Sequence, residues 1–263
     1  MSSIDTELAN TIRQDILDGS FEHGARITEA KLCDSHKVSR TPVRLALRRL
    51  EQEGMIRKGE GRGYVVEEIT VNDIRQAVQV RGHLESLAAR LMAQKESQAQ
   101  DLDRMARAIE QIDSLIEKGS LDDDTIRKMH AQNFAFHNTI LECCGNSYVK
   151  FTCNQISHLP MLASGSMVFD RDSINSKDIE KTILRLKIGN SQHRIIYKSI
   201  EQGDPVRAEG MMREHSNTMI EYIEVFEQRK TKLTVRDLVS YSVQGDPADD
   251  NADERSLGKS AAS

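Results

Sequence analysis

Three histidines in the second half of the chain, His137, His193 and His215, have the spacing of either a metal site or a buried polar network. The stretch NFAFHNTILECCGN places Asn133 and His137 four residues apart, which stacks them on one face of a helix. His193 has isoleucines three and seven positions further on, and His215 has methionines four positions before and after it. These spacings predict that all three imidazoles face the apolar interior of a helical bundle.

Inward histidines allow two interpretations. A single buried histidine is more often an ordinary core residue with a hydrogen-bond partner. Three together are unfavourable to bury without partners, and one shared divalent ion would provide a partner for each of them. Imidazole ligands favour zinc or nickel over manganese, which prefers oxygen. The residues themselves leave open whether Asn133 and His137 are half of a metal site or an ordinary buried pair.

Arg81 and Glu85 form another polar pair with helical spacing. They share a predicted inward face with apolar residues of the stretch VQVRGHLESLAARLM. One interpretation is an internal ion pair between neighbouring turns. The other is that Arg81 binds the carboxylate of a small effector, because arginine recognises carboxylates through paired hydrogen bonds.

A different chemistry is indicated near the N-terminus. The chain has a net charge of −5, yet residues 37–62 carry eight basic and three acidic side chains. Arg40, Arg44 and Arg48 recur every four residues, with Arg49 beside them. A solvated helix face usually mixes both signs, whereas three stacked arginines repel one another. DNA phosphates would offset that repulsion, so we expect a DNA-binding helix here.

The first third of the chain supplies elements to position this helix. Apolar periodicity predicts helices over 4–18 and 29–36 and a third that starts near Pro42 and ends at Gly54. The segments MIRK and GYVVEE, joined by a glycine-rich turn, predict a hairpin. Helices followed by a hairpin, with a basic third helix, indicate a winged helix-turn-helix.

The rest of the chain predicts an all-α domain. Helical periodicity runs through 72–96, 101–118, 122–143, 147–165, 175–202 and 204–230, with an irregular stretch at SGSMVFDRDSINSKD. The last residues are polar and small, so we expect disorder there. The predicted organisation is a DNA-binding domain at 1–68, an effector and dimerisation domain at 69–230 and a disordered tail at 231–263.

Composition limits the class of protein. Hydrophobic residues make up 38%, charged residues 29%, and there is no tryptophan. No apolar run approaches the roughly 18 residues that a membrane-spanning helix needs. The start MSSIDTELANTIRQDIL has no basic segment followed by an apolar core, so we expect no signal peptide. The four cysteines include no CxxC pair, which favours reduced thiols in the cytoplasm.

The string VSRTPVRLALRRLEQEGMI, followed by RGYVV, resembles the DNA-binding domain of the GntR family of bacterial transcription regulators. The second domain resembles the helical FCD effector domain of its FadR-like branch in three stretches: RGHLESLAARLMA, NFAFHNTILECCGNSYV and QHRIIYKSIEQGDPVRAEGMMREH. There is a weaker similarity to the branch that regulates vanillate-type aromatic acid breakdown. Together the matching stretches cover about residues 5–228. One departure is Leu45, where the family usually has glutamate.

The resemblance implies a homodimer that binds a palindromic double-stranded operator. The third helix would enter the major groove and the wing would reach toward the minor groove. Its implied DNA contacts are Arg40, Thr41, Arg44, Arg48, Arg49, Arg62 and Gly63. In the metal-binding FCD domains an aspartate and a histidine at i and i+4 join two later histidines, which implies ligands at Asn133, His137, His193 and His215.

Asn133 departs from this pattern, because the family usually has aspartate there. A neutral amide would leave a bound divalent ion its full charge. We expect weaker metal binding and stronger attraction for an anionic ligand, and we expect Asn133→Asp to tighten metal binding. Effectors of the family are commonly small carboxylates, for which Arg81 and Glu85 would form part of the pocket.

The main prediction is a cytoplasmic, ligand-responsive regulator and not an enzyme, in most such cases a repressor. The alternative is a zinc hydrolase that uses the three histidines, with Glu85 as the one inward carboxylate to act as a base. It would lack an HExxH motif and would leave the basic winged helix unexplained. A DNA-architectural protein without an effector would leave the buried polar residues unexplained.

Overall fold

A computed structural model describes residues 3–61, 63–168, 179–229 and 232–241, without the side chains of the last two. The chain divides into two compact units. The first comprises the described residues up to Ile74 together with Lys232–Val239, and the second begins at Arg75 and includes the remaining long helices. Within the described residues, no helix combines the length and apolar composition that crossing a membrane requires.

The first unit has the predicted winged helix-turn-helix fold. Its elements are α1 (Ile4–Leu17), β1 (Arg26–Ile27), α2 (Glu29–His36), α3 (Arg40–Gln52), β2 (Ile56–Lys58) and β3 (Tyr64–Val66). The antiparallel sheet has the order β1-β3-β2, so β3 is central. Apolar side chains from the helices and the sheet form one core, to which α3 contributes Val43, Ala46, Leu47 and Leu50.

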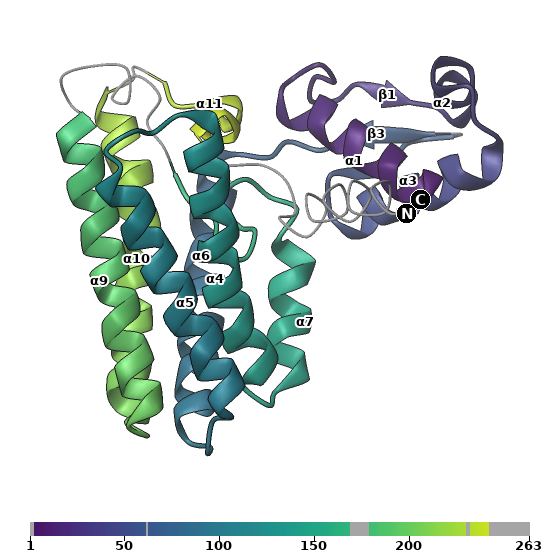
Figure 1. Ribbon diagram of the computed structural model, residues 1–263. Helices are drawn as coiled ribbons and strands as arrows, with labels where there is room; N and C mark the ends of the chain where they lie inside the picture. The colour runs from purple at the N-terminus through teal and green to yellow at the C-terminus, as the bar shows by residue number, and fades with distance from the viewer. Residues whose placement is uncertain (1–2, 62, 169–178, 230–231, 242–263) are drawn as a thin grey trace, which may run out of the picture. The chain divides into compact units, whose positions relative to one another are not determined.

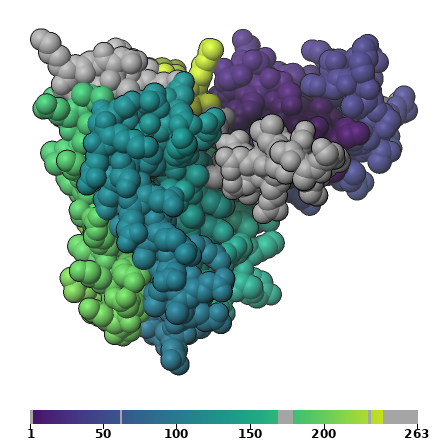
Figure 2. All heavy atoms as spheres, viewed as in Figure 1, coloured from purple at the N-terminus to yellow at the C-terminus, as the bar shows by residue number. Residues whose placement is uncertain are grey.

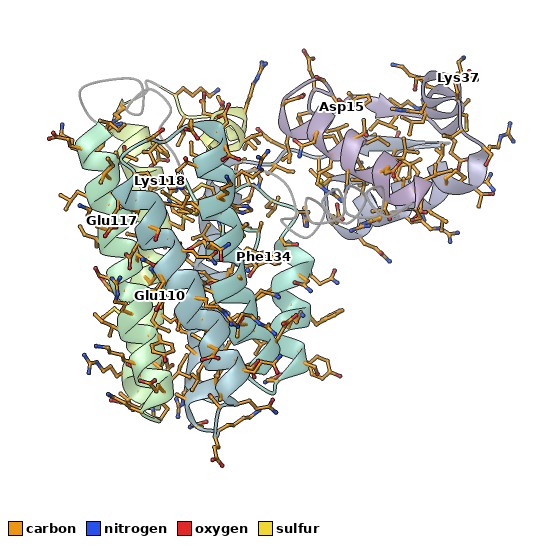
Figure 3. All side chains as sticks on the ribbon, viewed as in Figure 1. Asp15, Lys37, Glu110, Glu117, Lys118 and Phe134 are labelled. Atoms are coloured by element: carbon orange, nitrogen blue, oxygen red, sulfur yellow. The ribbon has the colours of Figure 1, made fainter. Side chains whose placement is uncertain are left out.

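Local sequence explains where these helices begin and end. Thr28 accepts a hydrogen bond from the backbone N–H of Lys31 and so caps α2. Lys37, labelled in Figure 3, follows α2 in the left-handed conformation with φ 55°, which makes the short turn into α3. Gly54, with φ 73°, lies just beyond the end of α3. The turn and the glycine together orient the basic helix.

The C-terminal prediction was wrong in one part. We expected disorder from residue 231 onward, but Val235–Tyr241 forms α11, and Leu238 is fully buried. Val235 and Val239 pack against the core of the first unit. A few apolar residues are enough to hold α11 in place, because they pack against a core that the rest of the first unit already forms. Residues 242–263 lie outside the described part of the chain.

The second unit is the predicted helical bundle, built from α4 (Val71–Ala93), α5 (Ala99–Glu117), α6 (Asp123–Cys143), α7 (Ser147–Ile156), α9 (Ile179–Glu201) and α10 (Pro205–Arg229). The long helices run side by side (Figure 1). A tight turn at Gly203, with φ 66°, makes α9 and α10 an antiparallel pair. The pairing sets residues of α9 opposite residues of α10 along the whole bundle.

The amphipathic pattern of α5 shows how the bundle excludes water. Its buried face includes Met105, Ile109 and Ile112. Glu110 and Glu117 project outward from the same helix (Figure 3). The outer faces of α5 and α9 adjoin on the front of the bundle (Figure 2), in agreement with their packing contacts. This layer covers an interior that contains many polar side chains.

The helix predicted over 147–165 is shorter than expected. It ends at Ile156, and a loop follows through Val168. Pro160 in this loop has no N–H to continue a helix, and Met161 adopts a left-handed φ of 65°. The start of the helix predicted at 175 lies outside the described residues, and α9 is described from Ile179.

Candidate metal centre and nucleic-acid interface

The bundle brings together the three histidines from three separate helices. One nitrogen each from His137 of α6, His193 of α9 and His215 of α10 lies within 4.8 Å of the other two. The Nε2 atoms of His193 and His215 are 3.1 Å apart. The rings of His137 and His215 stack with centroids 5.3 Å apart. The spacing in the sequence therefore predicted a real cluster, whose use as a metal site stays a prediction.

Neighbouring amides determine which ring nitrogens carry protons. His193 Nδ1 lies 3.3 Å from Asn190 Oδ1, and His215 Nδ1 lies 2.9 Å from Gln192 Oε1. The orientation of Asn190 follows from its Nδ2, which donates to the carbonyl of Ile109 and to a carboxylate oxygen of Asp113. His193 Nδ1 therefore donates to Asn190, and its Nε2 presents a lone pair; with the Gln192 oxygen as acceptor, His215 Nε2 presents one as well. Two lone pairs that face each other repel unless a cation lies between them.

Protonation does not supply that cation at neutral pH. Burial lowers the pKa of His215 to about 3, with His137 adding to the effect, and it lowers the pKa of His193 well below its usual value. His137 Nδ1 is also buried and lies 3.6 Å from the carboxylate oxygen Oε2 of Glu85. Zn–N bonds of ~2.0–2.1 Å in a tetrahedron put ligand nitrogens about 3.3 Å apart, close to the observed separation of the two Nε2 atoms. The donor set therefore fits a divalent metal ion.

Arg81 and Glu85 form a buried ion pair beside the histidines. Arg81 Nε donates to Glu85 Oε1 at 2.9 Å, and Arg81 Nη1 donates to the carbonyl of Leu162 at 2.6 Å. Burial acts to raise the pKa of Glu85, but Arg81 and His137 outweigh it and lower the pKa to about 2. A carboxylate this acidic is a poor general base, which weakens the hydrolase alternative. The geometry is that of the internal ion pair, and effector binding by Arg81 stays a prediction.

Asn133 is buried and ties a loop to α6. Its Nδ2 donates to the carbonyl oxygen of Gly165 at 2.8 Å. A Cβ on Gly165 would lie 2.5 Å from the backbone nitrogen of Phe134, so only glycine allows the loop to come this close. An aspartate could not donate this hydrogen bond. The amide oxygen of Asn133 is the atom left for a metal, and its ligation stays a prediction.

A cavity of about 320 Å³ lies against the cluster. All four predicted metal ligands and the Arg81–Glu85 pair line it. Apolar side chains of the loop after α7 and of α9 and α10 make up much of the remaining wall, including Met161, Leu162, Leu186 and Met219. The volume is at the lower end of the range for small-molecule sites.

The predicted DNA-binding side chains of α3 are exposed. Arg40, Thr41, Arg44 and Arg48 face solvent on the side of the helix opposite its buried stripe. Arg44 donates to the carboxylate of Glu29 at 2.9 Å in an exposed pair. This arrangement leaves the basic face open to a phosphate backbone, while the individual DNA contacts stay predictions.

Two of the residues predicted to contact DNA, Arg49 and Gly63, also have a structural role within the first unit. Arg49 is exposed but pairs at 3.2 Å with Glu53, which Arg13 also binds. Gly63 has φ 123°, and a Cβ there would lie 2.8 Å from the carbonyl oxygen of Ile27, so glycine allows β3 to approach β1. Arg62, the remaining wing residue, lies outside the described part of the chain.

Comparison with known proteins identifies the family. Residues 76–218 match the FCD domain, and residues 5–66 match the bacterial regulatory proteins of the gntR family. The chain belongs to the GntR family of regulators with an FCD domain. It is a DNA-binding transcription regulator, and the all-α second unit is its FCD domain.

Several GntR relatives align over most of this chain. The regulator YdhC of Bacillus subtilis (strain 168), described as uncharacterized, is 27% identical over 84% of this chain and 92% of its own. LutR of the same organism is 26% identical over 76% of this chain and 92% of its own. The probable D-xylose utilization operon transcriptional repressor of Paenarthrobacter nicotinovorans is 25% identical, with coverages of 81% and 86%. These names give no support to the hydrolase alternative.

Solved structures agree with the fold. The E. coli protein McbR/YncC superposes with a TM-score of 0.56 at 18% identity, covering 88% of this chain and all of that one. Lar, which controls expression of the Listeria monocytogenes agr system, gives 0.54 at 16% identity, with coverages of 87% and 98%. At this level of identity the two structures support the fold and say nothing about ligand or function.

Two groups that line the FCD cavity were missed at the level of sequence. Arg185 of α9 and Ser216 of α10 both contribute to its wall. Arg185 precedes His193 by eight residues, and Ser216 follows His215 directly. The spacing of Arg185 is a usable signal, because residues seven or eight apart share a helix face.

Proposed function

We propose that the chain is a repressor that a small carboxylate releases from its operator, and that the carboxylate binds at a metal ion in the cavity of the FCD domain. The observation that carries the proposal is the cluster of three histidines beside that cavity, in which the Nε2 atoms of His193 and His215 lie 3.1 Å apart. A chain with this site and a GntR DNA-binding unit has both parts of a ligand-dependent switch.

His137, His193 and His215 would hold the ion, with the amide oxygen of Asn133 as a fourth ligand. Zinc or nickel suits this donor set. The metal would supply a fixed double positive charge for a carboxylate oxygen. The protein adds no net charge to balance the metal ion, because His193 and His215 are uncharged and Arg81 neutralises Glu85. An anion would therefore meet an uncompensated charge in a largely buried pocket.

Repression is supported by the names of relatives. The Paenarthrobacter relative is named as a D-xylose operon repressor, and a Bacillus licheniformis relative, 25% identical over 77% of this chain, as a gluconate operon repressor. We further propose a cytoplasmic homodimer. Two copies of α3 related by a two-fold axis would read the two halves of a palindromic operator.

A metal analysis and a thermal-shift screen test the proposal. Purified protein is expected to contain zinc or nickel, or to bind it stoichiometrically after treatment with a chelator. Small carboxylates should raise the melting temperature only when metal is present, because ligand binding to the folded state stabilises it. His215→Ala should abolish both effects, whereas His23→Ala, at an exposed position of the first unit, should abolish neither. Protein that neither contains nor takes up metal would contradict the proposal.

A further inference from the structure

Arg185 gives the cavity a positive charge that no carboxylate of the described residues pairs with. Its guanidinium lies over the ring of Tyr222, with Cζ 5.4 Å from the ring centroid. Within the described part of the chain, no carboxylate lies at ion-pair distance from Arg185. Glu221 also lines the cavity, but it is exposed and is not paired with Arg185. Arg81, in contrast, uses its donors on Glu85 and on backbone carbonyls.

Arg185 and Tyr222 lie at the end of the cavity away from the histidines. Arg185 precedes His193 by eight residues on α9, which is about 12 Å along a helix. Tyr222 follows His215 by seven residues on α10, or about 10 Å. Because α9 and α10 are antiparallel, both displacements run in the same direction. The cavity therefore has a histidine end and an arginine end, separated by two helical turns.

The wall between the two ends is mainly apolar. Leu186 of α9 and Met219 of α10 lie between the ends in sequence, and Ile112 of α5 adds a third apolar side chain. Gly189 contributes no side chain, and a Cβ there would come within 4.0 Å of His215 Cε1. A ligand can therefore pass along this wall next to the cluster without meeting a charged group.

The histidine end offers one further donor. Ser216 Oγ is buried, lines the cavity beside His215 and has no hydrogen-bond partner within the described residues. A buried hydroxyl without a partner is costly, so a ligand oxygen at this position would stabilise it. At the other end, burial raises the pKa of Tyr222, so its phenol stays protonated.

We propose that the effector carries two anionic groups joined by an apolar segment. One carboxylate lies at the histidine cluster within reach of Ser216, and the second pairs with Arg185, whose guanidinium Tyr222 holds in place. This inference rests on the proposed function and adds the class of ligand to it. A linear dicarboxylate has this chemistry, whereas a monocarboxylate leaves Arg185 without a partner.

Matched pairs of acids test the role of Arg185. Butyrate and succinate, hexanoate and adipate, and octanoate and suberate differ within each pair only in the second carboxylate. Titration calorimetry on zinc-loaded full-length protein should show one dicarboxylate binding about tenfold or more tightly than its monocarboxylate partner. Arg185→Gln should remove that preference and leave monocarboxylate affinity within about twofold. Lys187→Gln, which removes an exposed charge from the same helix, should preserve it.

The outcomes distinguish this inference from the proposed function. If Arg185→Gln keeps the preference, if each pair binds equally, or if no dicarboxylate binds the zinc-loaded protein, the two-ended ligand is wrong. If His215→Ala abolishes binding of both members of a pair while Arg185→Gln changes nothing, the metal-dependent function stands and only the inference fails. If carboxylates bind the metal-free protein equally well, the proposed function fails. Arg185→Lys, which keeps the charge, should retain part of the preference.

Discussion

The exposed arginines of α3 and the buried Arg81 of the FCD bundle have opposite roles. On α3, Arg40, Arg44 and Arg48 stand in solvent above a fully apolar buried face. In the FCD bundle, Arg81 is buried and paired with Glu85. An exposed guanidinium stays hydrated and can exchange water for phosphate, whereas a buried one must be neutralised within the fold. The exposed arginines of α3 are therefore available for binding, whereas Arg81 contributes to the shape of the cavity.

The largest predicted difference in stability is between removal of the buried guanidinium of Arg81 and removal of the exposed guanidinium of Arg44. Arg81→Met should cost about 3–5 kcal/mol of unfolding free energy, because it leaves the carboxylate of Glu85 buried without its guanidinium partner. Arg44→Met removes an exposed pair and should cost less than about 1 kcal/mol. Urea denaturation measures both, and similar costs would contradict the division between the two units. Arg44→Met should instead weaken operator binding.

Removal of an apolar side chain should test whether α11 belongs to the first unit. Leu238→Ala deletes a fully buried side chain and should destabilise the fold by about 2–5 kcal/mol. Leu184→Ala is the matched control, because Leu184 of α9 is 58% exposed and should change stability by no more than about 0.5 kcal/mol. Val239→Ala, which shortens a side chain packed against that core, should lower hydrogen-exchange protection in the first unit. Unchanged protection there would contradict the packing of α11 on that core.

Asn133→Asp tests two roles of this buried side chain, its hydrogen bond to Gly165 and its contribution to metal binding. The loss of the hydrogen bond to Gly165 should destabilise the metal-free protein by about 1–3 kcal/mol. Metal affinity should rise, because the new carboxylate adds a negative ligand. Thermal unfolding with chelator and with zinc separates the two effects. A variant that is stabilised in both conditions would show that Asn133 does not hold the loop.

The smallest predicted difference lies within α3. Arg48→Ala should lower operator affinity by about 1–3 kcal/mol, because no described carboxylate pairs with Arg48. Arg49→Ala should have less effect on affinity, since Arg49 pairs with Glu53. Fluorescence anisotropy on a DNA site selected from a random pool measures both variants. A larger loss of operator affinity for Arg49→Ala than for Arg48→Ala would contradict the view that Arg48 contacts DNA more strongly.

The sequence predicted elements whose period and caps are local. Gly54 placed the end of α3 correctly because it acts on its own backbone. The side chains of Thr28 and of the Thr70–Asp73 pair cap helix starts through hydrogen bonds of the same local kind. The inward faces of His137, His193 and His215 followed from apolar neighbours on the same helices. The resemblance to the GntR family then assigned the DNA-binding unit, which the comparisons confirm.

Other features depend on contacts between distant segments. The packing of Val235 and Val239 on the first core cannot be derived from a polar tail. The bond from Asn133 to Gly165 joins residues 32 apart across a loop. Whether Arg81 or Arg185 is free for a ligand depends on which carboxylates reach each guanidinium. Spacing along one helix does not contain that information.

A carboxylate bound at the metal site is expected to weaken DNA binding. The direct measurement is operator affinity of the zinc-loaded protein with and without the carboxylate that binds most tightly, compared with His215→Ala. The ligand is expected to lower the operator affinity of the wild-type protein by about 5–150-fold and to leave that of His215→Ala unchanged. Operator affinity that is the same with and without bound carboxylate would contradict this expectation.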